Sequence, residues 1–186
     1  MDVAATSRFL ALLAFVAVGG AVAVTALRFL PGPRVAGVRT DVARIAPWLA
    51  AAVAVASTGG SLYYSEIAGF VPCELCWFQR IAMYPLAVIL PVAAARGDRT
   101  VGRYALPLAL LGAAVAIYHV QLQAFPDQAT SCDAAAPCTV REVTAFGFVT
   151  IPMMALAGFV TVVTLLVAAR TRHTDVPAPT TEVPAP

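Results

Sequence analysis

The sequence predicts an all-α membrane protein: a four-transmembrane-helix bundle with an additional N-terminal transmembrane helix, five in total. Hydrophobic residues make up 60% of the 186 residues, above the roughly 45–50% of soluble globular proteins. Charged residues make up only 12%, too few to cover a soluble surface of this size. Five apolar stretches are long enough, or nearly so, to cross about 30 Å of hydrocarbon at 1.5 Å per residue. They cover residues 9–27, 45–64, 74–95, 104–122 and 148–169.

The first stretch, residues 9–27, could be mistaken for a signal peptide, because Arg8 precedes an apolar run that has small residues near its end. Its 19 residues exceed the usual apolar core of about 7–15 residues. Cleavage near Ala26 would also leave the arginines between positions 28 and 44 outside the cell, against the positive-inside rule. We therefore expect residues 1–44 to form an uncleaved additional transmembrane helix and a cytoplasmic connection.

The arginines predict the orientation of the helices. One side of the membrane receives nine of them: Arg28, Arg34, Arg39, Arg44, Arg96, Arg99, Arg103, Arg170 and Arg172. The other side receives two, Arg8 and Arg141, and the connection at 65–72 has none. Because cytoplasmic loops carry an excess of arginine and lysine, we expect the N-terminus outside and the C-terminus in the cytoplasm. All four cysteines are then extracytoplasmic.

Two cysteines open the third stretch, in the segment VPCELCWFQR at residues 71–80. Pro72 favours a helix start here, so Cys76 and Arg80 follow Cys73 at i+3 and i+7 and share its helical face. By helical rise, Arg80 lies roughly 6 Å deeper than Cys76. A helix N-terminus and a nearby guanidinium both favour thiolate over thiol. Since thiolates carry out disulfide exchange, this face predicts redox chemistry.

Two polar residues near this pair allow both a structural and a functional interpretation. Arg80 could simply snorkel to the lipid headgroups. Charges within a membrane are costly and usually functional, however, and the adjacent thiol pair favours a functional role. His119 closes the fourth stretch on the same membrane side as the cysteines. It could be an interfacial residue hydrogen-bonded to backbone or water, or it could contact a cofactor.

The second thiol pair, Cys132 and Cys138, lies in the loop at about 123–147. A disulfide between them closes a small ring and gains little as a staple, although a plain structural disulfide remains an alternative. An exposed pair in a mobile loop is better placed to meet a protein partner. A metal site built from all four cysteines is disfavoured, since zinc sites usually pair two C-x2-C units and the second pair here is C-x5-C. No metal is expected.

Three segments resemble the DsbB/BdbC family of disulfide bond formation proteins. PCELCWFQRIAMYPL is similar to that family's C-x-L-C-x-x-Q/E-R pattern followed by an apolar helix, and YHVQLQ at 118–123 and GFVTIPMMAL at 147–156 resemble later segments. The resemblance implies a DsbB-like four-helix bundle over residues 45–172 in a bacterial cell (inner) membrane. Residues 173–186 form a Pro/Thr-rich cytoplasmic tail that we expect to be disordered.

The resemblance also implies an enzyme, a quinone-dependent disulfide-generating oxidoreductase, and an order of reaction for its cysteines. Cys132 would form a mixed disulfide with an extracytoplasmic thioredoxin-fold partner, a DsbA/BdbD-like thiol oxidase. Cys138 would relay the exchange toward Cys73. The short spacing between Cys132 and Cys138 resembles the BdbC side of the family more than its Gram-negative members.

On the acceptor side, the resemblance implies a bound quinone, menaquinone or ubiquinone. Cys76 would be the thiolate that meets the quinone, Arg80 would stabilise negative charge on the thiolate or the reduced quinone, and His119 would lie near the quinone. Membrane lipid is the other expected partner. Nucleic acid is not expected.

Two alternatives remain beside this interpretation. A non-catalytic membrane scaffold or chaperone subunit would use the same cysteines only as structural extracytoplasmic disulfides. A vitamin K epoxide reductase-like enzyme would carry its C-x-x-C after the loop pair, and here the order is reversed. The additional N-terminal helix lies outside the family core, and the sequence assigns it no role.

Overall fold

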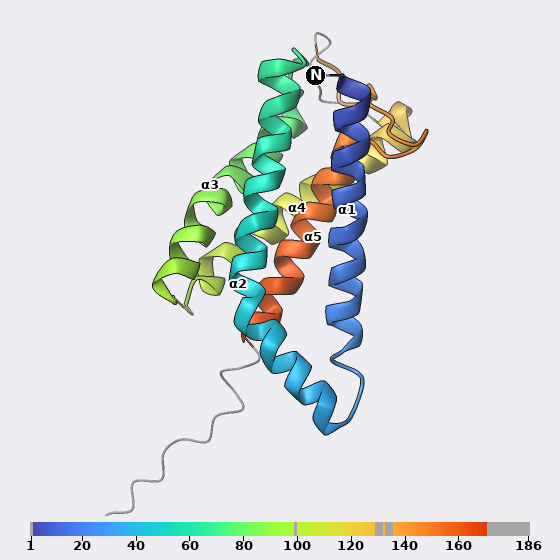
Figure 1. Cartoon of the computed structure of the whole chain (residues 1–186). Coiled ribbons are helices and arrows are strands. Elements are labelled where there is room, and N and C mark those ends of the chain that lie inside the picture. The colour runs from blue at the N-terminus through green and yellow to red at the C-terminus, as the bar shows by residue number, and fades with distance from the viewer. Residues whose placement is uncertain (1, 99, 129–131, 133–135, 171–186) are drawn as a thin grey trace, which may run out of the picture.

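The computed structural model describes residues 2–98, 100–128, 132 and 136–170, and these form a helical bundle (Figure 1). The long helices are α1 (Val3–Ala26), α2 (Pro33–Leu62), α3 (Glu74–Arg96), α4 (Gly102–Ala124) and α5 (Ile151–Arg170). A π-helical turn, η1 (Tyr63–Ile67), continues α2, and a 3-10 turn, η2 (Pro126–Gln128), follows α4. All five long helices are apolar and long enough to cross a membrane, which confirms the predicted five-helix membrane fold. Arg99 and the predicted tail lie outside the described residues.

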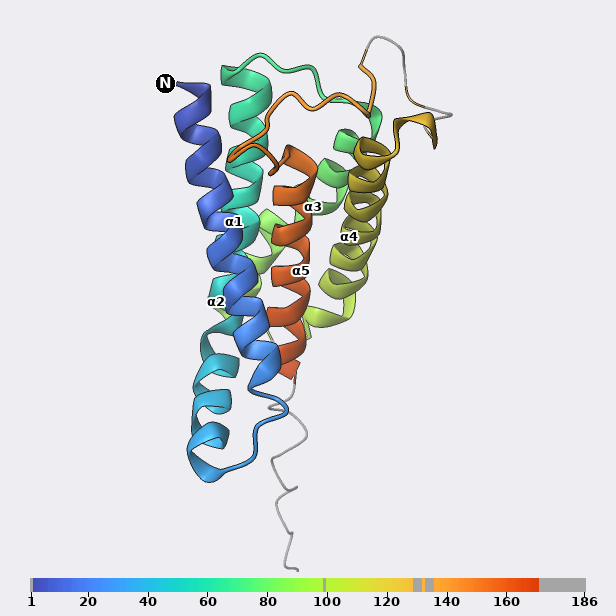
Figure 2. The ribbon, with the colours of Figure 1, turned by 90° about the vertical axis from the view of Figure 1, so that its right-hand side faces the viewer.

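Helix α5 forms the middle of the bundle, with α1, α2 and α4 packed against it (Figures 1 and 2). Half of the residues in the most apolar segment of α5 are buried. In α1, which lies at the periphery, the corresponding share is 11%. Small residues let these helices approach closely, as is usual in membranes. Gly112 of α4 is an example, since a Cβ at this position would overlap the fully buried ring of Phe159 on α5.

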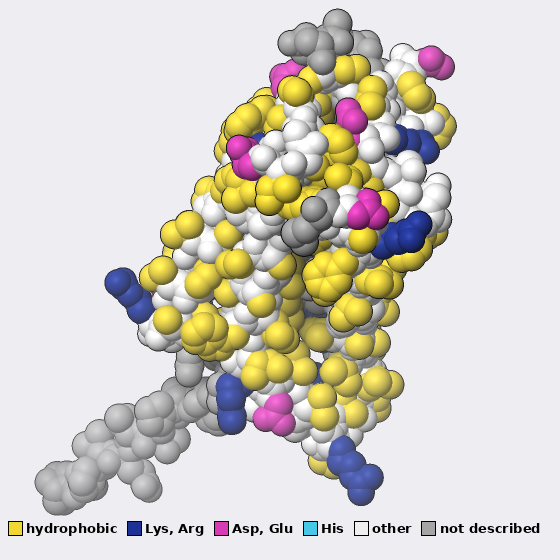
Figure 3. All heavy atoms as spheres, turned by 45° about the horizontal axis from the view of Figure 1, so that its top comes forward, with side chains coloured by type: hydrophobic (Ala, Val, Ile, Leu, Met, Phe, Trp, Pro, Cys, Tyr) yellow, Lys and Arg dark blue, Asp and Glu magenta, His cyan; other side chains and the backbone are white. Residues whose placement is uncertain are grey.

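The outer face of the bundle is apolar. Val16 of α1, Val88 of α3 and Leu111 of α4 are exposed by 73%, 67% and 65%. In the space-filling view of Figure 3, hydrophobic side chains cover much of the visible face, and charged side chains are scattered mostly toward its upper and lower ends. So much exposed apolar surface requires lipid rather than water around it, as expected for a multi-pass membrane protein.

Helix α2 begins earlier than the apolar pattern predicted. The pattern placed a helix from residue 45 and a connection before it, whereas α2 begins at Pro33, a residue favoured at the first helical position. At 1.5 Å per residue its 30 residues span about 45 Å, more than the hydrocarbon thickness. The turns that carry Arg34, Arg39 and Arg44 therefore extend past the apolar span. A hydropathy pattern does not detect such a charged extension.

The connections divide between two ends of the bundle (Figures 1 and 2). The α1–α2 and α3–α4 connections lie at one end, together with the arginine-bearing helix ends that flank them and the end of α5. The N-terminus, the segment between η1 and α3, and the loop between α4 and α5 lie at the other end, which we call the thiol end because it holds all four cysteines. The antiparallel helices thus separate these arginines from the thiols.

Candidate redox site

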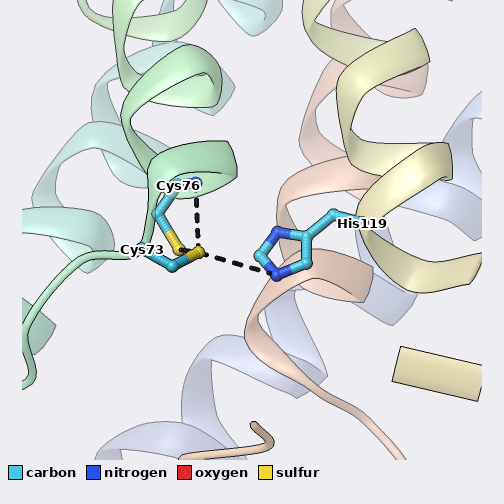
Figure 4. Close-up of side chains that lie close together, drawn as sticks. All are labelled: Cys73, Cys76 and His119. Carbon is cyan, nitrogen blue, oxygen red and sulfur yellow. Dashed lines mark hydrogen bonds between the residues drawn. The ribbon is translucent and has the colours of Figure 1, made fainter. Parts of the chain in front are cut away.

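The first thiol pair is built into the start of α3. Cys73 is the N-cap residue, and its Sγ accepts a hydrogen bond from the backbone N–H of Cys76 at 3.3 Å. At most N-caps an oxygen accepts this hydrogen bond, whereas here it is the sulfur of Cys73. Because this bond joins Cys73 to the residue that carries the second thiol, the side chains of Cys73 and Cys76 lie together, and both point toward His119 on α4 (Figure 4).

The two sulfur atoms of this pair are close enough to form a disulfide after a small movement. Cys73 and Cys76 are free thiols with their Sγ atoms 2.7 Å apart, against about 2.05 Å in a disulfide. Together with His119 they offer donor atoms within 4.8 Å of one another, a group that could hold a metal ion. Two thiolates on one tetrahedral zinc would stand about 3.8 Å apart, given Zn–S bonds of about 2.3 Å. The observed separation thus suits disulfide chemistry better than metal binding.

His119 joins the two cysteine pairs. It is 2% exposed, and its Nε2 lies 3.1 Å from the carbonyl oxygen of Cys138 and 3.8 Å from Sγ of Cys73. Because a carbonyl only accepts, Nε2 carries the proton, and Nδ1 accepts from the side-chain amide of Gln79 at 2.9 Å. The ring is therefore fixed in orientation, with Nε2 between the carbonyl oxygen of Cys138 and Sγ of Cys73. The His119 side chain is buried rather than interfacial, although its bond to the Cys138 carbonyl is a backbone hydrogen bond of the kind that the structural interpretation expected.

Gln79 is a residue of this site that the sequence reasoning missed. It is 7% exposed, lies one turn after Cys76 in α3, and fixes the orientation of the His119 ring. A signal was present, because the quoted C-x-L-C-x-x-Q/E-R pattern includes this position. Its role depends on a contact with α4, however, and a pattern within one helix does not contain that contact.

Cys73 precedes the membrane-spanning part of α3, and its pKa is lowered. The hydrogen bond with the Cys76 side chain is the largest cause, burial acts in the opposite direction, and His119 lowers the pKa further, to about 4. Cys73 is therefore expected to be a thiolate at neutral pH, the form that attacks disulfides.

A pH profile tests this environment. In a Cys76→Ser variant, whose hydroxyl keeps a donor beside Cys73, alkylation of Cys73 by iodoacetamide should persist below pH 7. An ordinary thiol, with a pKa of about 8.5, loses about tenfold in rate per pH unit there. Adding His119→Leu removes one stabilising donor, so the fall in rate should move to higher pH. Labelling of residue 73 would be followed by mass spectrometry, and a midpoint near 8.5 in both variants would contradict the assignment.

The second pair is a disulfide that packs against the first pair. Cys132 and Cys138 are joined with an S–S distance of 2.04 Å, so they are not available as metal ligands in this state. Cys138 is 1% exposed and forms one apolar cluster with Cys73 and Leu122, which Cys76 and Cys132 extend. The expectation of an exposed loop pair is therefore wrong for Cys138, whereas Cys132 is half-buried.

Hydrogen bonds to α4 explain why the loop buries Cys138. The side-chain amide of Gln123, at the end of α4, donates to the carbonyl of Val140 at 3.0 Å, and Arg141 donates to the carbonyl of Gln123 at 2.6 Å. These two bonds hold the segment that follows Cys138 against the helix that carries His119. These bonds thus hold the Cys132–Cys138 disulfide beside the thiols of Cys73 and Cys76.

Arg80 lies on a different side of α3 from His119. Its Nε donates to the Ser61 hydroxyl and one Nη donates to the Ser61 carbonyl, both at 3.0 Å, and its guanidinium lies 5.1 Å from the Trp77 ring and 5.9 Å from the Tyr84 ring. Two of its five N–H groups are used by α2, which leaves donors for a ligand. Arg80 is thus anchored to α2, which the snorkelling interpretation does not require.

Two cavities meet at the thiol pair. The larger, about 670 Å³, is lined mostly by apolar residues of α1, α2 and α5, together with Cys76 and Arg80. The smaller, about 300 Å³, is lined by Cys73 and by Ala136 and Pro137 of the disulfide loop. Cys76 and His119 are among the residues that line both. The predicted common face is therefore divided: Cys76 and Arg80 share the larger cavity, whereas Cys73 lies on the loop side.

A multi-pass helical membrane protein that holds a dithiol against a neighbouring disulfide belongs to the class of membrane thiol oxidoreductases. Comparison with known proteins identifies the family. The family model described as disulfide bond formation protein DsbB matches residues 43–169, more than half of the chain. The chain therefore belongs to the DsbB family of disulfide bond formation proteins.

Curated relatives agree with this assignment. Disulfide bond formation protein C of Bacillus subtilis is 44% identical over 120 residues, which cover 63% of this chain and 85% of the relative. A probable disulfide formation protein C of Bacillus cereus is 43% identical over 127 residues (67% and 88%). A probable disulfide formation protein of Metapseudomonas resinovorans is 45% identical over 130 residues (68% and 88%). No solved structure matches the chain significantly.

Proposed function

We propose that this chain is a membrane thiol:quinone oxidoreductase that reoxidises an extracytoplasmic thioredoxin-fold disulfide donor and passes the electrons to menaquinone or ubiquinone. One observation carries the proposal: Cys76 lies between a cavity beside the disulfide loop and a larger apolar cavity among the membrane helices. A thiol in that position can exchange electrons with a protein on one side and with a lipid-soluble acceptor on the other.

The first exchange takes place at the loop. A thiolate of the reduced partner attacks Cys132, whose half-exposed position is the accessible end of the disulfide, and Cys138 leaves as a thiolate. The second partner thiol then breaks the mixed disulfide. The partner departs oxidised, and its two electrons and two protons remain on Cys132 and Cys138.

The second exchange transfers the electrons to α3. When Cys73 and Cys76 are joined as a disulfide, Cys138 attacks Cys73, its neighbour in the apolar cluster, and Cys76 leaves as a thiolate. Cys132 then attacks Cys138, which restores the loop disulfide and releases Cys73. The His119 N–H, 3.8 Å from Sγ of Cys73, stabilises the thiolate that is released. The result has an intact loop disulfide and two free thiols on α3.

The residues of the larger cavity fit a quinone. A quinone supplies an acceptor for two electrons and two protons, the number released when Cys73 and Cys76 form a disulfide. The N–H groups of Arg80 that Ser61 leaves unused can bind a carbonyl oxygen, and the apolar walls exclude water. Cys76 is the sulfur that faces this cavity.

We further propose that the thiol end is extracytoplasmic and the membrane is a bacterial cell (inner) membrane. The connections flanked by arginine-bearing helix ends lie at the opposite end of the bundle, as the positive-inside rule requires of cytoplasmic loops. A thioredoxin-fold partner could then reach Cys132 in the oxidising compartment.

The direct test is oxygen-free turnover of a reduced thioredoxin-fold partner by the purified protein in detergent, with and without added quinone. We expect many partner molecules oxidised per chain with quinone, and about one without it, from the loop disulfide alone. Micelles without protein control for direct oxidation of the partner. If no partner is oxidised with either quinone, and both cysteine pairs remain as inert disulfides, the non-catalytic scaffold is the correct interpretation.

A further inference from the structure

Helix α1 is held to the bundle at the thiol end and along α5. The Tyr64 hydroxyl donates to the buried Ser7 hydroxyl at 3.0 Å, and the Leu10 side chain packs over the bare backbone of Gly60. Farther along, Phe15 contacts the rings of Phe146 and Phe148, with centroids 6.2 and 6.3 Å away. Apart from the Leu10–Gly60 contact near the thiol end, α1 packs mainly on α5 rather than on α2, its neighbour in sequence.

The larger cavity fills the space that this arrangement leaves between α1 and α2. On α1 its lining runs from Leu10 to Val24, and on α2 and η1 it runs from Leu49 to Ser65. Fourteen residues of helix correspond to about 21 Å, so the cavity follows most of the membrane thickness. Its walls are apolar over nearly all of this length, and its polar groups include Cys76 and Arg80 toward the thiol end.

The shape and chemistry of the cavity favour one kind of occupant. A long apolar channel with a cationic donor and a thiol near one end matches a molecule with a polar redox-active head and a long hydrocarbon tail. The channel begins at the proposed acceptor site rather than elsewhere on the lipid-facing surface. The wall contributed by α1 lies outside the family match, which begins at residue 43.

We propose that α1 forms one wall of a channel for the polyisoprenoid tail of the quinone, so that the additional N-terminal helix is part of the acceptor site and selects acceptors by their tails. The proposal rests on the proposed function. It predicts that narrowing the channel along α1 discriminates against long-tail quinones and spares a quinone whose tail is too short to reach the altered position.

Two adjacent glycines of α1 provide a matched test. Gly20 lines the cavity and Gly19 does not, and a Cβ at either position would meet no atom within 4 Å. Gly20→Leu therefore adds a side chain to the channel from a position where its Cβ meets no other atom, whereas Gly19→Leu adds the same side chain elsewhere. Both substitutions improve helix propensity equally, so a difference between them reports the channel rather than the stability of α1.

The readouts are the amount of long-tail quinone that copurifies with each variant and the thermal stabilisation that added long-tail or tail-less quinone gives. Gly20→Leu should retain about tenfold less long-tail quinone, as overpacking a filled site predicts, while its stabilisation by tail-less quinone stays unchanged. Gly19→Leu should behave as the unaltered protein in both measurements.

The outcomes separate this inference from the proposed function. If the unaltered protein binds both quinones and Gly20→Leu binds the long-tail form equally well, the channel assignment is wrong and the quinone function stands. If the unaltered protein binds no quinone of either kind, the proposed function fails, and this inference fails with it. Copurification of phospholipid in place of quinone, lost in Gly20→Leu, would identify the channel as a lipid site and overturn the inference.

Discussion

Replacing Cys76 with serine should abolish quinone-dependent turnover, by about a thousandfold or more, as expected when the reacting group itself is removed. The variant should nevertheless oxidise about one partner molecule per chain. The reason is that the Cys132–Cys138 disulfide is intact and needs no other cysteine for its first exchange. With Cys76 absent, the electrons cannot proceed, because Cys73 has no partner with which to form a disulfide on α3. Rapid mixing with reduced partner would measure both the initial burst, in which each chain oxidises one partner molecule, and the steady-state rate that follows.

The burst also serves as the control for folding, because a misfolded variant would lose it. A second control is the double variant Cys132→Ser Cys138→Ser, which should show no burst with the protein partner. It should still reduce quinone when given a small dithiol, since the 300 Å³ cavity leads to Cys73 from the loop side. Normal steady-state turnover in Cys76→Ser would show that Cys76 does not transfer electrons to the quinone.

The membrane fold could be predicted from the sequence because its cause is local. Each span is a run of apolar residues, and the start of α3 depends on Pro72 and Cys73, which are neighbours in the chain. The spacing of Cys76 and Arg80 also places both on the larger cavity, as the helical period requires. These features depend on contacts within about one or two turns of helix.

The parts that were missed depend on contacts between distant segments. The buried state of Cys138 follows from the bonds between the loop and Gln123, and the orientation of His119 follows from Gln79 on another helix. The position of α1 against α5 rather than α2 is decided by packing, since both neighbours offer apolar surface. A hydropathy pattern predicts that α1 is apolar, but it does not predict which helix α1 packs against.

Replacing Arg80 with alanine should raise the quinone concentration needed for half-maximal turnover by about 10–100-fold. Hydrogen bonds to a charged group are worth about 1.5–3 kcal/mol, and each 1.4 kcal/mol corresponds to a factor of ten. The single-turnover oxidation of the partner should not change, because Arg80 lies on the α2 side of α3 and has no contact with the disulfide loop among its described interactions. Steady-state kinetics against quinone, combined with the burst measurement, would separate the two effects.

Two further variants test whether the Arg80 guanidinium binds the quinone or only anchors α3 to α2. Arg80→Lys keeps the positive charge but loses the planar fork of donors, so it should fall between alanine and the unaltered protein. Ser61→Ala removes the hydroxyl that accepts from Nε but keeps the backbone carbonyl that accepts from Nη, so its effect should be smaller than that of Arg80→Ala. An unchanged quinone requirement in Arg80→Ala would mean that this arginine only anchors α3 to α2. A loss of the single-turnover oxidation of the partner would instead show that the anchoring supports the whole thiol end, because the loop disulfide would then depend on a contact on another side of α3.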